Sequence, residues 1–388
     1  MGMFRFLTAG ESHGKGLVVI IEGMPAGLPL DEDYIAGHLA RRQCGYGRGE
    51  RMDIEQDRAE ILSGVRQGLT IGSPLSLLIP NLDWENWQQI MSISPVEQEV
   101  EPLTQLRPGH ADLAGAIKYG LDDVRPILER ASARETASRV AAGAVARRLL
   151  KELGIELHSY TVCIGGCWSK RIDPIDWSIV EKSPVRCIDS ETERIMMVAI
   201  DEAKDAGDSV GGVFEVIADG VPIGLGSHAH WDRRLDGRIA QAMMSINAVK
   251  GVESGSGFTV ANVHGSQVHD IIETDKKGLW HHATNRAGGI EGGISNGEPI
   301  VVRAAVKPIP TLTKPLPSVD LRTGKEVEAH VERSDVCVVP AAGIIGEAML
   351  ALVLAEAVVE KFGGDHISEL VRNYKGYLDT IGPRSQNE

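Results

Sequence analysis

The sequence predicts an α/β sandwich, a fold in which sheets and long helices pack against each other, and three observations lead to this fold class. Apolar runs bounded by glycine indicate strands at residues 16–24 and 212–221. Four segments have the length and the end residues of helices. The chain also resembles itself, because residues 11–28 and 208–225 share eight identities in eighteen aligned positions without a gap. Such a repeat indicates a fold built of two related halves.

Two weaker matches follow in the same order and extend the repeat. Residues 63–79 align with 288–304 through three glycines and one proline, and ERAS at 129–132 aligns with ERSD at 332–335. We therefore expect a single domain with an internal pseudo-twofold repeat. The predicted domain covers residues 1–388. It consists of two related halves at about 4–153 and 205–363, joined by a connecting segment at 154–204.

The first two helices are predicted at 30–43 and 135–154. Acidic residues open the first and two arginines close it, which suits the helix dipole at both ends. A glycine ends the second. Around its start, Arg130 and Arg134 are four residues apart, so a continuous helix would place both on one face.

The third helix is predicted at 190–207, where Ser190 and a glutamate three residues later form a capping box. The fourth, at 343–364, is the longest and most apolar predicted helix. Because it contains Glu347 and Glu356, we expect a buried core helix rather than a membrane span.

The composition is that of a globular protein, with 43% hydrophobic and 24% charged residues. A net charge of −14 argues against a general nucleic-acid-binding protein. Five scattered cysteines indicate free thiols in a reducing compartment. No cleavable leader is recognised, and we expect a cytoplasmic protein without a membrane partner. The acidic segment 83–106 and the proline-rich segment 307–318 are predicted to be long loops.

Arginines are concentrated in two places despite the acidic balance. Residues 41–51 contain four arginines and residues 125–148 contain six. Such islands suit a buried anion site, because arginine makes planar, bidentate contacts with carboxylate and phosphate. Solvated helix faces would give the same pattern, and this alternative stays open for each arginine.

A histidine near the start of the chain is the first candidate for chemistry. His13 lies in the turn GESHGKG, and the second copy of the repeat keeps the serine and the glycine that flank it but has Val210 in its place. The fold itself therefore does not require an imidazole there, and we infer a chemical role. The turn is not a P-loop, because Gly16 stands where Ser or Thr would bind magnesium. No dinucleotide-binding GxGxxG motif follows a strand.

Further candidates lie in three short motifs. LRPGHAD places Arg107 and His110 on one turn, KPIPTLTKPLP combines lysine with proline, and ERSDVC places Asp335 before the apolar helix. A surface turn, an extended polyproline linker and a helix cap are the respective alternatives. Metal binding is not expected at HAHW or HH, because carboxylate or cysteine partners at metal-site spacing are missing.

Three long segments are similar to signatures of the chorismate synthase family. They are GESHGKGLVVIIEGMP, ERASARETASRVAAGAV and RSDVCVVPAAGIIGEAM. The shorter motifs RRQCGYGRGERM, LRPGHAD, INAVKGVESG, AGGIEGGISNG and KPIPT also resemble family motifs, in family order. The resemblance covers essentially the whole chain. One departure is Ser334, where many members have histidine.

The resemblance implies a β-α-β sandwich with internal pseudo-symmetry, assembled as a homotetramer. It implies a lyase that catalyses the 1,4-elimination of phosphate from 5-enolpyruvylshikimate 3-phosphate to give chorismate, in the shikimate pathway of aromatic amino acid biosynthesis. Reduced FMN is the implied cofactor, with no net redox change. NADPH would serve only as an indirect reductant, because members that use it themselves tend to be longer than this chain.

The resemblance also implies roles for residues of this sequence. His13 would protonate the departing phosphate, His110 would control the protonation of the flavin, and Asp335 with Ser12 would accept a proton from flavin N5. The implied substrate-binding residues are Arg42, Arg48, Arg107, Arg134 and Arg333. The implied flavin contacts are Arg130, Ala131, Ser132, Asn247, Ala248, Gly292, Lys307, Pro308, Ile309, Pro310, Thr311 and Arg333.

Two other functions fit the same residues. A flavin-dependent NAD(P)H oxidoreductase would need external reductant for each turnover, whereas elimination releases phosphate at a constant flavin oxidation state. An anion-binding scaffold would bind a phosphorylated ligand and release no phosphate. His13 and His110 argue against the scaffold, because imidazole titrates near neutral pH and suits proton transfer.

Overall fold

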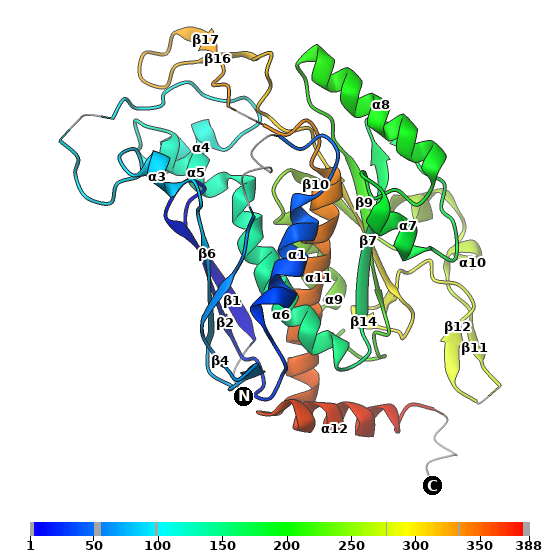
Figure 1. The fold of residues 1–388 in the computed structure, drawn as a ribbon. Coiled ribbons are helices and arrows are strands. Elements are labelled where there is room, and N and C mark those ends of the chain that lie inside the picture. The colour runs from blue at the N-terminus through cyan, green and yellow to red at the C-terminus, as the bar shows by residue number, and fades with distance from the viewer. Residues whose placement is uncertain (1–3, 50–55, 98–99, 277, 333, 383–388) are drawn as a thin grey trace.

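Two antiparallel sheets enclose a layer of helices, so that the chain forms a β-α-β sandwich (Figure 1). The computed structural model describes residues 4–49, 56–97, 100–276, 278–332 and 334–382. Helices α6 (Thr136–Lys151) and α11 (Val339–Phe362) pack against each other at the centre of the helical layer. The predicted α/β fold class is confirmed.

The first sheet has the strand order β1-β2-β6-β3. Along β2, Leu17, Val19 and Ile21 are buried and alternate with less buried residues, as expected for a strand with one face on a core. The buried face contacts α6. The strands are β1 (Arg5–Ala9), β2 (Gly16–Glu22), β3 (Glu60–Ser63) and β6 (Leu75–Pro80), and a small hairpin is formed by β4 (Val65–Arg66) and β5 (Leu69–Thr70).

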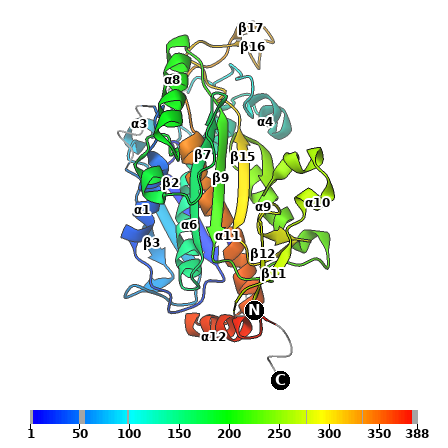
Figure 2. The same ribbon diagram turned by 90° about the vertical axis from the view of Figure 1, so that its right-hand side faces the viewer.

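The second sheet has the strand order β10-β15-β9-β7-β8, and Figure 2 shows β7, β9 and β15 side by side. Its inner face packs on α11 through β7 and β9. The strands are β7 (Glu156–Ile164), β8 (Cys167–Trp168), β9 (Gly212–Asp219), β10 (Val249–Ser254) and β15 (Ile300–Val306).

The two sheets correspond along the segments that the sequence repeat aligns. Residues aligned with β2 lie in β9, and residues aligned with β6 lie in β15; both strand pairs are antiparallel. The hairpin β4–β5 is matched by β13 (Ile290–Glu291) and β14 (Ile294–Ser295). These matches support our proposal of two related halves. The segment 154–204 is more than a connection, because it contributes β7 to the interior of the second sheet.

The four predicted helices are present with shifted ends. The helix α11 begins four residues before its predicted start, since Pro340 is tolerated in a first helical turn. The cap of α8 is Asp189 and not the predicted Ser190, because the Asp189 carboxylate accepts hydrogen bonds from two backbone amides of the first turn. The observed bounds are α1 (Glu32–Gln43), α6 (Thr136–Lys151), α8 (Ser190–Ala206) and α11 (Val339–Phe362).

Arg130 and Arg134 do not share one helical face, because the continuous helix that this would require is interrupted. The chain leaves the helix at Ser132, with φ −61° and ψ 144°, between α5 (Arg125–Ala131) and a 3-10 turn at Ala133–Glu135. Arg130 therefore extends toward β1, where it donates to the carbonyls of two residues, while Arg134 is buried.

Shorter elements lie outside the central layers. The acidic segment that was expected to be a loop contains a one-turn helix next to the first sheet. The remaining elements are α3 (Trp84–Trp87), α4 (Asp112–Tyr119), α7 (Trp177–Lys182), α9 (Leu235–Met244), α10 (Gly265–Val268), α12 (Ile367–Leu378), β11 (Ile272–Thr274), β12 (Trp280–His282), β16 (Pro317–Val319) and β17 (Glu326–Glu328), with 3-10 turns at Trp231–Arg233 and Gly257–Asn262.

The apolar helix α11 belongs to the core of the fold. It is long and apolar enough to cross a membrane, yet 94% of its most apolar window is buried inside the protein. The expected core helix is confirmed.

A small hydrophobic cluster lies apart from the main core. It contains the buried side chains of Leu106, Ala116 and Val124, with Leu103 and Leu321 packed against them. These residues hold together α4, the start of α5 and the loop that leads to β17, so the cluster supports the segment that contains Arg107 and His110.

Candidate active site

A cavity of about 460 Å³ opens at one end of the helical layer. Its walls come from the turn between β1 and β2, the segment after α1, the starts of α6 and α11, and the loops after β15 and β17. The N-terminal ends of helices have a partial positive charge and unpaired amides, so two of them at one cavity favour an anionic ligand.

Arg42 and Arg134 meet at a carboxylate that the sequence analysis missed. Arg134 Nη1 lies 3.1 Å from Asp57 Oδ1, and Arg42 Nη1 lies 3.6 Å from Asp57 Oδ2. Arg42 Nε also donates to Thr136 Oγ1 at 3.1 Å, which ties α1 to the start of α6. All these side chains are buried, and a buried charge is costly unless it is paired. Asp57 therefore helps to fix both guanidinium groups at the cavity wall.

Arg48 and Asp335 form a second pair at the cavity. Arg48 Nη1 lies 3.1 Å from Asp335 Oδ2, and the Gly49 amide donates to Asp335 Oδ1 at 2.6 Å. Asp335 therefore contacts the segment after α1. Among the described residues, no side chain makes a capping hydrogen bond at the start of α11. The alternative interpretation of Asp335 as a helix cap is not supported.

His13 is held on two sides. Its Nδ1 lies 2.7 Å from Glu129 Oε1, and its backbone amide donates to Glu129 Oε2 at 2.6 Å. The indole ring of Trp87 stacks on the imidazole with 3.7 Å between ring centroids and an interplanar angle of 22°. Next to it, Ser132 Oγ donates to Ser12 Oγ at 3.1 Å. Trp87 comes from α3, so the acidic segment covers this part of the site.

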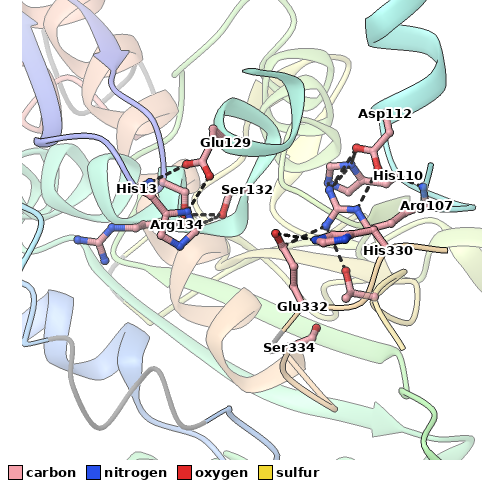
Figure 3. A network of polar contacts seen from close by, with 12 residues as sticks. His13, Arg107, His110, Asp112, Glu129, Ser132, Arg134, His330, Glu332 and Ser334 are labelled. Carbon is pink, nitrogen blue, oxygen red and sulfur yellow. Dashed lines mark hydrogen bonds and ion pairs between the residues drawn. The ribbon is translucent and has the colours of Figure 1, made fainter. Parts of the chain in front are cut away.

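His110 lies across the cavity from His13, and its Nδ1 also contacts a carboxylate, that of Asp112 (Figure 3). Arg107 donates to the same carboxylate through Nε at 2.9 Å and through Nη2 at 3.1 Å. Burial alone would raise the pKa of Asp112, but the hydrogen bonds from His110 and Arg107 lower it well below its usual range. Asp112 thus remains charged and orients both residues.

Glu332 brings another negative charge to the cavity. Its carboxylate lies 3.5 Å from Arg107 Nη1 and 3.3 Å from His330 Nε2. Burial would raise the pKa of Glu332, but the hydrogen bond from His330 and the charge of Arg107 lower it. Glu332 occupies the position that the repeat aligns with Glu129; Glu332 lines the cavity itself, whereas Glu129 contacts the lining residue His13.

Two lysines complete the basic lining. Lys307 Nζ donates to the carbonyl of Gly109, and Lys250 on β10 lies at the same cavity. Burial and the nearby charge of Lys250 lower the pKa of Lys307. The amine therefore loses its proton at a lower pH than an exposed lysine.

Most of the predicted site residues line this one cavity. They are Ser12, His13, Arg42, Arg48, Arg107, His110, Ala131, Ser132, Arg134, Asn247, Ala248, Lys307, Ile309, Pro310, Thr311 and Asp335. Three predicted residues do not line the cavity within the described part of a single chain: Arg130, Pro308 and Gly292. Gly292 lies in the turn between β13 and β14. Arg333 lies outside the described residues.

The sequence analysis missed the acidic partners of the site. Glu129 and Glu332 were present in the aligned ER pairs, and Asp112 stood in the motif LRPGHAD, so their proximity to the candidate histidines and arginines was visible in the sequence. Asp57 and Trp87 had no such signal, because they reach the site through the tertiary fold.

Neither metal nor disulfide chemistry finds support in the described residues. They contain no group of three or more His, Cys, Asp or Glu side chains that could hold a metal ion. The five cysteines are unpaired thiols.

These features define the class of the protein. Guanidinium and ammonium groups converge on an enclosed space whose size suits a small molecule, and imidazole and carboxylate groups that can move protons stand beside them. The protein is therefore an α/β enzyme that acts on a small-molecule substrate.

Comparison with known proteins names the family. The chorismate synthase family model matches residues 4–359. The chain is 58% identical to chorismate synthase of Moorella thermoacetica, over 98% of this chain and 100% of the relative. It is 53% identical to chorismate synthase of Streptomyces avermitilis, over 98% of this chain and 99% of the relative.

A solved structure agrees with this assignment. A crystal structure of a chorismate synthase superposes with a TM-score of 0.79 at 46% identity, over 97% of this chain and 98% of the other. The chain belongs to the chorismate synthase family, whose members are lyases. The resemblance noted in the sequence is confirmed, and an oxidoreductase function is not favoured.

Proposed function

We propose that the protein catalyses the 1,4-elimination of phosphate from 5-enolpyruvylshikimate 3-phosphate to give chorismate. In this reaction one C–H bond and one C–O bond break, a C=C bond forms, and phosphate leaves with the electrons of the C–O bond. The observation that carries the proposal is the convergence of His13, His110, Asp335 and the buried arginines on one cavity.

The charges of the cavity fit a substrate with two carboxylates and one phosphate. Four described arginines and two lysines line it, against the carboxylates of Asp335 and Glu332. Guanidinium groups bind carboxylate and phosphate in bidentate fashion. Fixed positive charge also stabilises a departing phosphate more than the bound substrate, which is the requirement for catalysis.

The remaining walls of the cavity fit reduced FMN. Small or apolar side chains leave room for a flat ring, while Lys250 and Lys307 provide ammonium groups for a phosphate. The residues that would hold the cofactor are Ala131, Ser132, Asn247, Ala248, Lys307, Ile309, Pro310 and Thr311. When bound, reduced FMN would supply an electron-rich ring that is restored at the end of the reaction.

Three groups would handle protons. His13 would donate to the leaving phosphate, a role in which a positioned acid contributes about 10²- to 10⁴-fold to the rate. Asp335, with Ser12, would accept a proton on the cofactor side of the cavity. His110, oriented by Asp112, would set the protonation of the cofactor ring.

A phosphate-release assay tests the proposal. Purified protein with the substrate and photoreduced FMN is expected to release phosphate and chorismate in equal amounts, without consumption of NADPH. Binding of the substrate without phosphate release would contradict the proposal and would favour an anion-binding scaffold. NAD(P)H oxidation that proceeds without the substrate would favour the oxidoreductase.

Assembly, location and electron supply are part of the same proposal. We propose a cytoplasmic homotetramer that binds neither nucleic acid nor a membrane and obtains reduced FMN from an external source, with NADPH as an indirect reductant. Exposed apolar side chains around the β11–β12 hairpin, including Ile272 and Trp280, offer a surface for self-association. Light scattering should give the mass of four chains of 41.8 kDa, and a monomer mass would contradict this part.

A further inference from the structure

The geometry points to Glu129 as the positioning residue that fixes the tautomer of His13, so that Nδ1 keeps a proton and Nε2 becomes the nitrogen that exchanges one. This inference rests on the proposed function of His13 and adds a residue to which the sequence analysis gave no role.

Glu129 is well placed for this task, because its carboxylate is almost completely buried. The residue is 2% exposed and lies near the end of α5. Three hydrogen bonds join it to the turn that carries His13. The Glu129 carboxylate contacts the His13 backbone amide at 2.6 Å and the His13 ring at 2.7 Å. The Ser12 backbone amide donates to the Glu129 carbonyl at 3.1 Å.

The two contacts of the carboxylate determine the tautomer. A carboxylate only accepts hydrogen bonds, and the His13 backbone amide only donates. Nδ1 must therefore also donate to Glu129, which places its proton on that nitrogen in the neutral ring. Trp87 restrains the ring from its face, so rotation of the imidazole would break both the stacking and the hydrogen bond.

This arrangement has a chemical purpose for a proton donor. A carboxylate that accepts from Nδ1 keeps a proton on that nitrogen, so Nε2 is left as the nitrogen that gives up a proton. In the Ser-His-Asp triad of serine proteases, a buried carboxylate likewise holds the histidine in the productive tautomer. The aligned glutamate Glu332 cannot serve in this way, because Val210 stands at the position that corresponds to His13.

Glu129→Gln is the variant that separates tautomer control from packing. It keeps the size of the side chain but has only one accepting oxygen for two donors. Since the backbone amide cannot change its role, the amide nitrogen of glutamine would face Nδ1, and the proton would move to Nε2. Glu215→Gln is the matched control, because Glu215 is also fully buried and bonds to Tyr160 and Arg303 away from the cavity.

The first measurement needs no activity. Solid-state ¹⁵N NMR of sedimented, histidine-labelled protein, recorded at increasing pH until the ring signals stop changing, reports the neutral tautomer. A difference spectrum against His13→Gln assigns the signals. We expect a protonated Nδ1 with an unprotonated Nε2 in the wild type and in Glu215→Gln, and the reverse in Glu129→Gln. An unprotonated Nδ1 in the wild type, or no change in Glu129→Gln, would overturn the inference.

The second measurement follows turnover. Glu129→Gln should lower kcat by at least about 10²-fold and leave the substrate KM close to the wild-type value, because binding groups are retained. In the double variant with His13→Ala, the Glu129 substitution should cost nothing further, since it acts through His13. Additive losses in the double variant would contradict the inference. If the wild type releases no phosphate, the proposed function fails, while the NMR result still decides the role of Glu129.

Discussion

At the scale of single residues, the site is organised by acids that hold its basic groups. Glu129 holds His13, Asp112 holds His110 and Arg107, and Asp57 lies between Arg42 and Arg134. The sequence pointed to the basic members because repeats and motifs contain them, whereas Asp57 reaches the site through tertiary folding. Within the motifs, the sequence analysis predicted the basic residues and missed acids such as Glu129 and Asp112 that hold them.

Replacement of Arg48 tests the anion site. Arg48→Ala removes a guanidinium that lies at the cavity 3.1 Å from Asp335, and a hydrogen bond to a charged group is worth about 1.5–3 kcal/mol. We expect the substrate KM to rise by roughly 10- to 100-fold. Arg58→Ala is the control, because Arg58 is exposed and pairs with Asp33 on the surface. An unchanged KM for Arg48→Ala would remove Arg48 from the site.

Replacement of His13 tests the proton donor. His13→Ala, supplied with reduced FMN, should lower kcat about 10²- to 10⁴-fold, because the leaving phosphate loses its acid. His230→Ala should retain wild-type turnover, since His230 is exposed and bonds to Asp232. Wild-type turnover in His13→Ala would show that the donor lies elsewhere.

At the scale of elements, the close packing of α6 on α11 determines how the sandwich holds together. A Cβ atom on Gly143 would lie 2.3 Å from Ala348 Cβ and 2.6 Å from Ala348 Cα. Backbone at this distance cannot give way cheaply, so the glycine permits the two helices to approach. The sequence predicted both helices but did not reveal this contact, because it depends on the pairing of distant segments.

Alanine at Gly143 should loosen this contact. We expect Gly143→Ala to lower the free energy of unfolding by about 1–3 kcal/mol, as for other overpacked cores. Gly37→Ala should instead raise it by up to about 1 kcal/mol, because Gly37 lies in α1 with nothing near its missing Cβ. Denaturant unfolding of both variants measures the difference, and equal effects would contradict the close-packing argument.

A buried acid on α11 makes stability depend on pH. Glu347 accepts hydrogen bonds from Arg41, Arg147 and Ser159, and lies fully buried. Burial would raise the pKa of Glu347, but the charges of Arg41 and Arg147 lower it to about 2. Since its usual value is near 4.5, the ion pairs contribute fully above that pH and are lost as the pH falls toward 2.

The expected size of this acid effect is about 3 kcal/mol, because one pKa unit corresponds to about 1.4 kcal/mol. Glu347→Gln should be less stable than the wild type near pH 7, where it leaves the arginines without their carboxylate. Its free energy of unfolding should also fall less steeply between about pH 4.5 and 2. Denaturant unfolding across this range measures how the free energy of unfolding of each protein depends on pH. Equal slopes for the wild type and Glu347→Gln would show that Glu347 does not cause the acid effect.

At the scale of the whole molecule, much of the architecture could be predicted from the sequence. The internal repeat gave aligned segments that fall on matching strands, and the composition of 343–364 gave a buried central helix. The break at Ser132 was not predictable, because the alanine-rich sequence around it has no proline or glycine to mark it. The assignment of β7 to the second sheet also depended on tertiary contacts, whereas the cap of α8 is a local contact of Asp189.

The small hydrophobic cluster around Leu106 and Val124 has a consequence for motion. Its side chains are few and separate from the main core, so we expect the segment that carries Arg107 and His110 to open more readily than the sandwich unfolds. Amide hydrogens of α4 should therefore exchange with deuterium much faster than those of α6 and α11. A ligand that contacts Arg107 would slow the exchange of the α4 amides toward the rates of α6 and α11. Exchange rates would therefore report occupancy of the cavity without any chemical turnover.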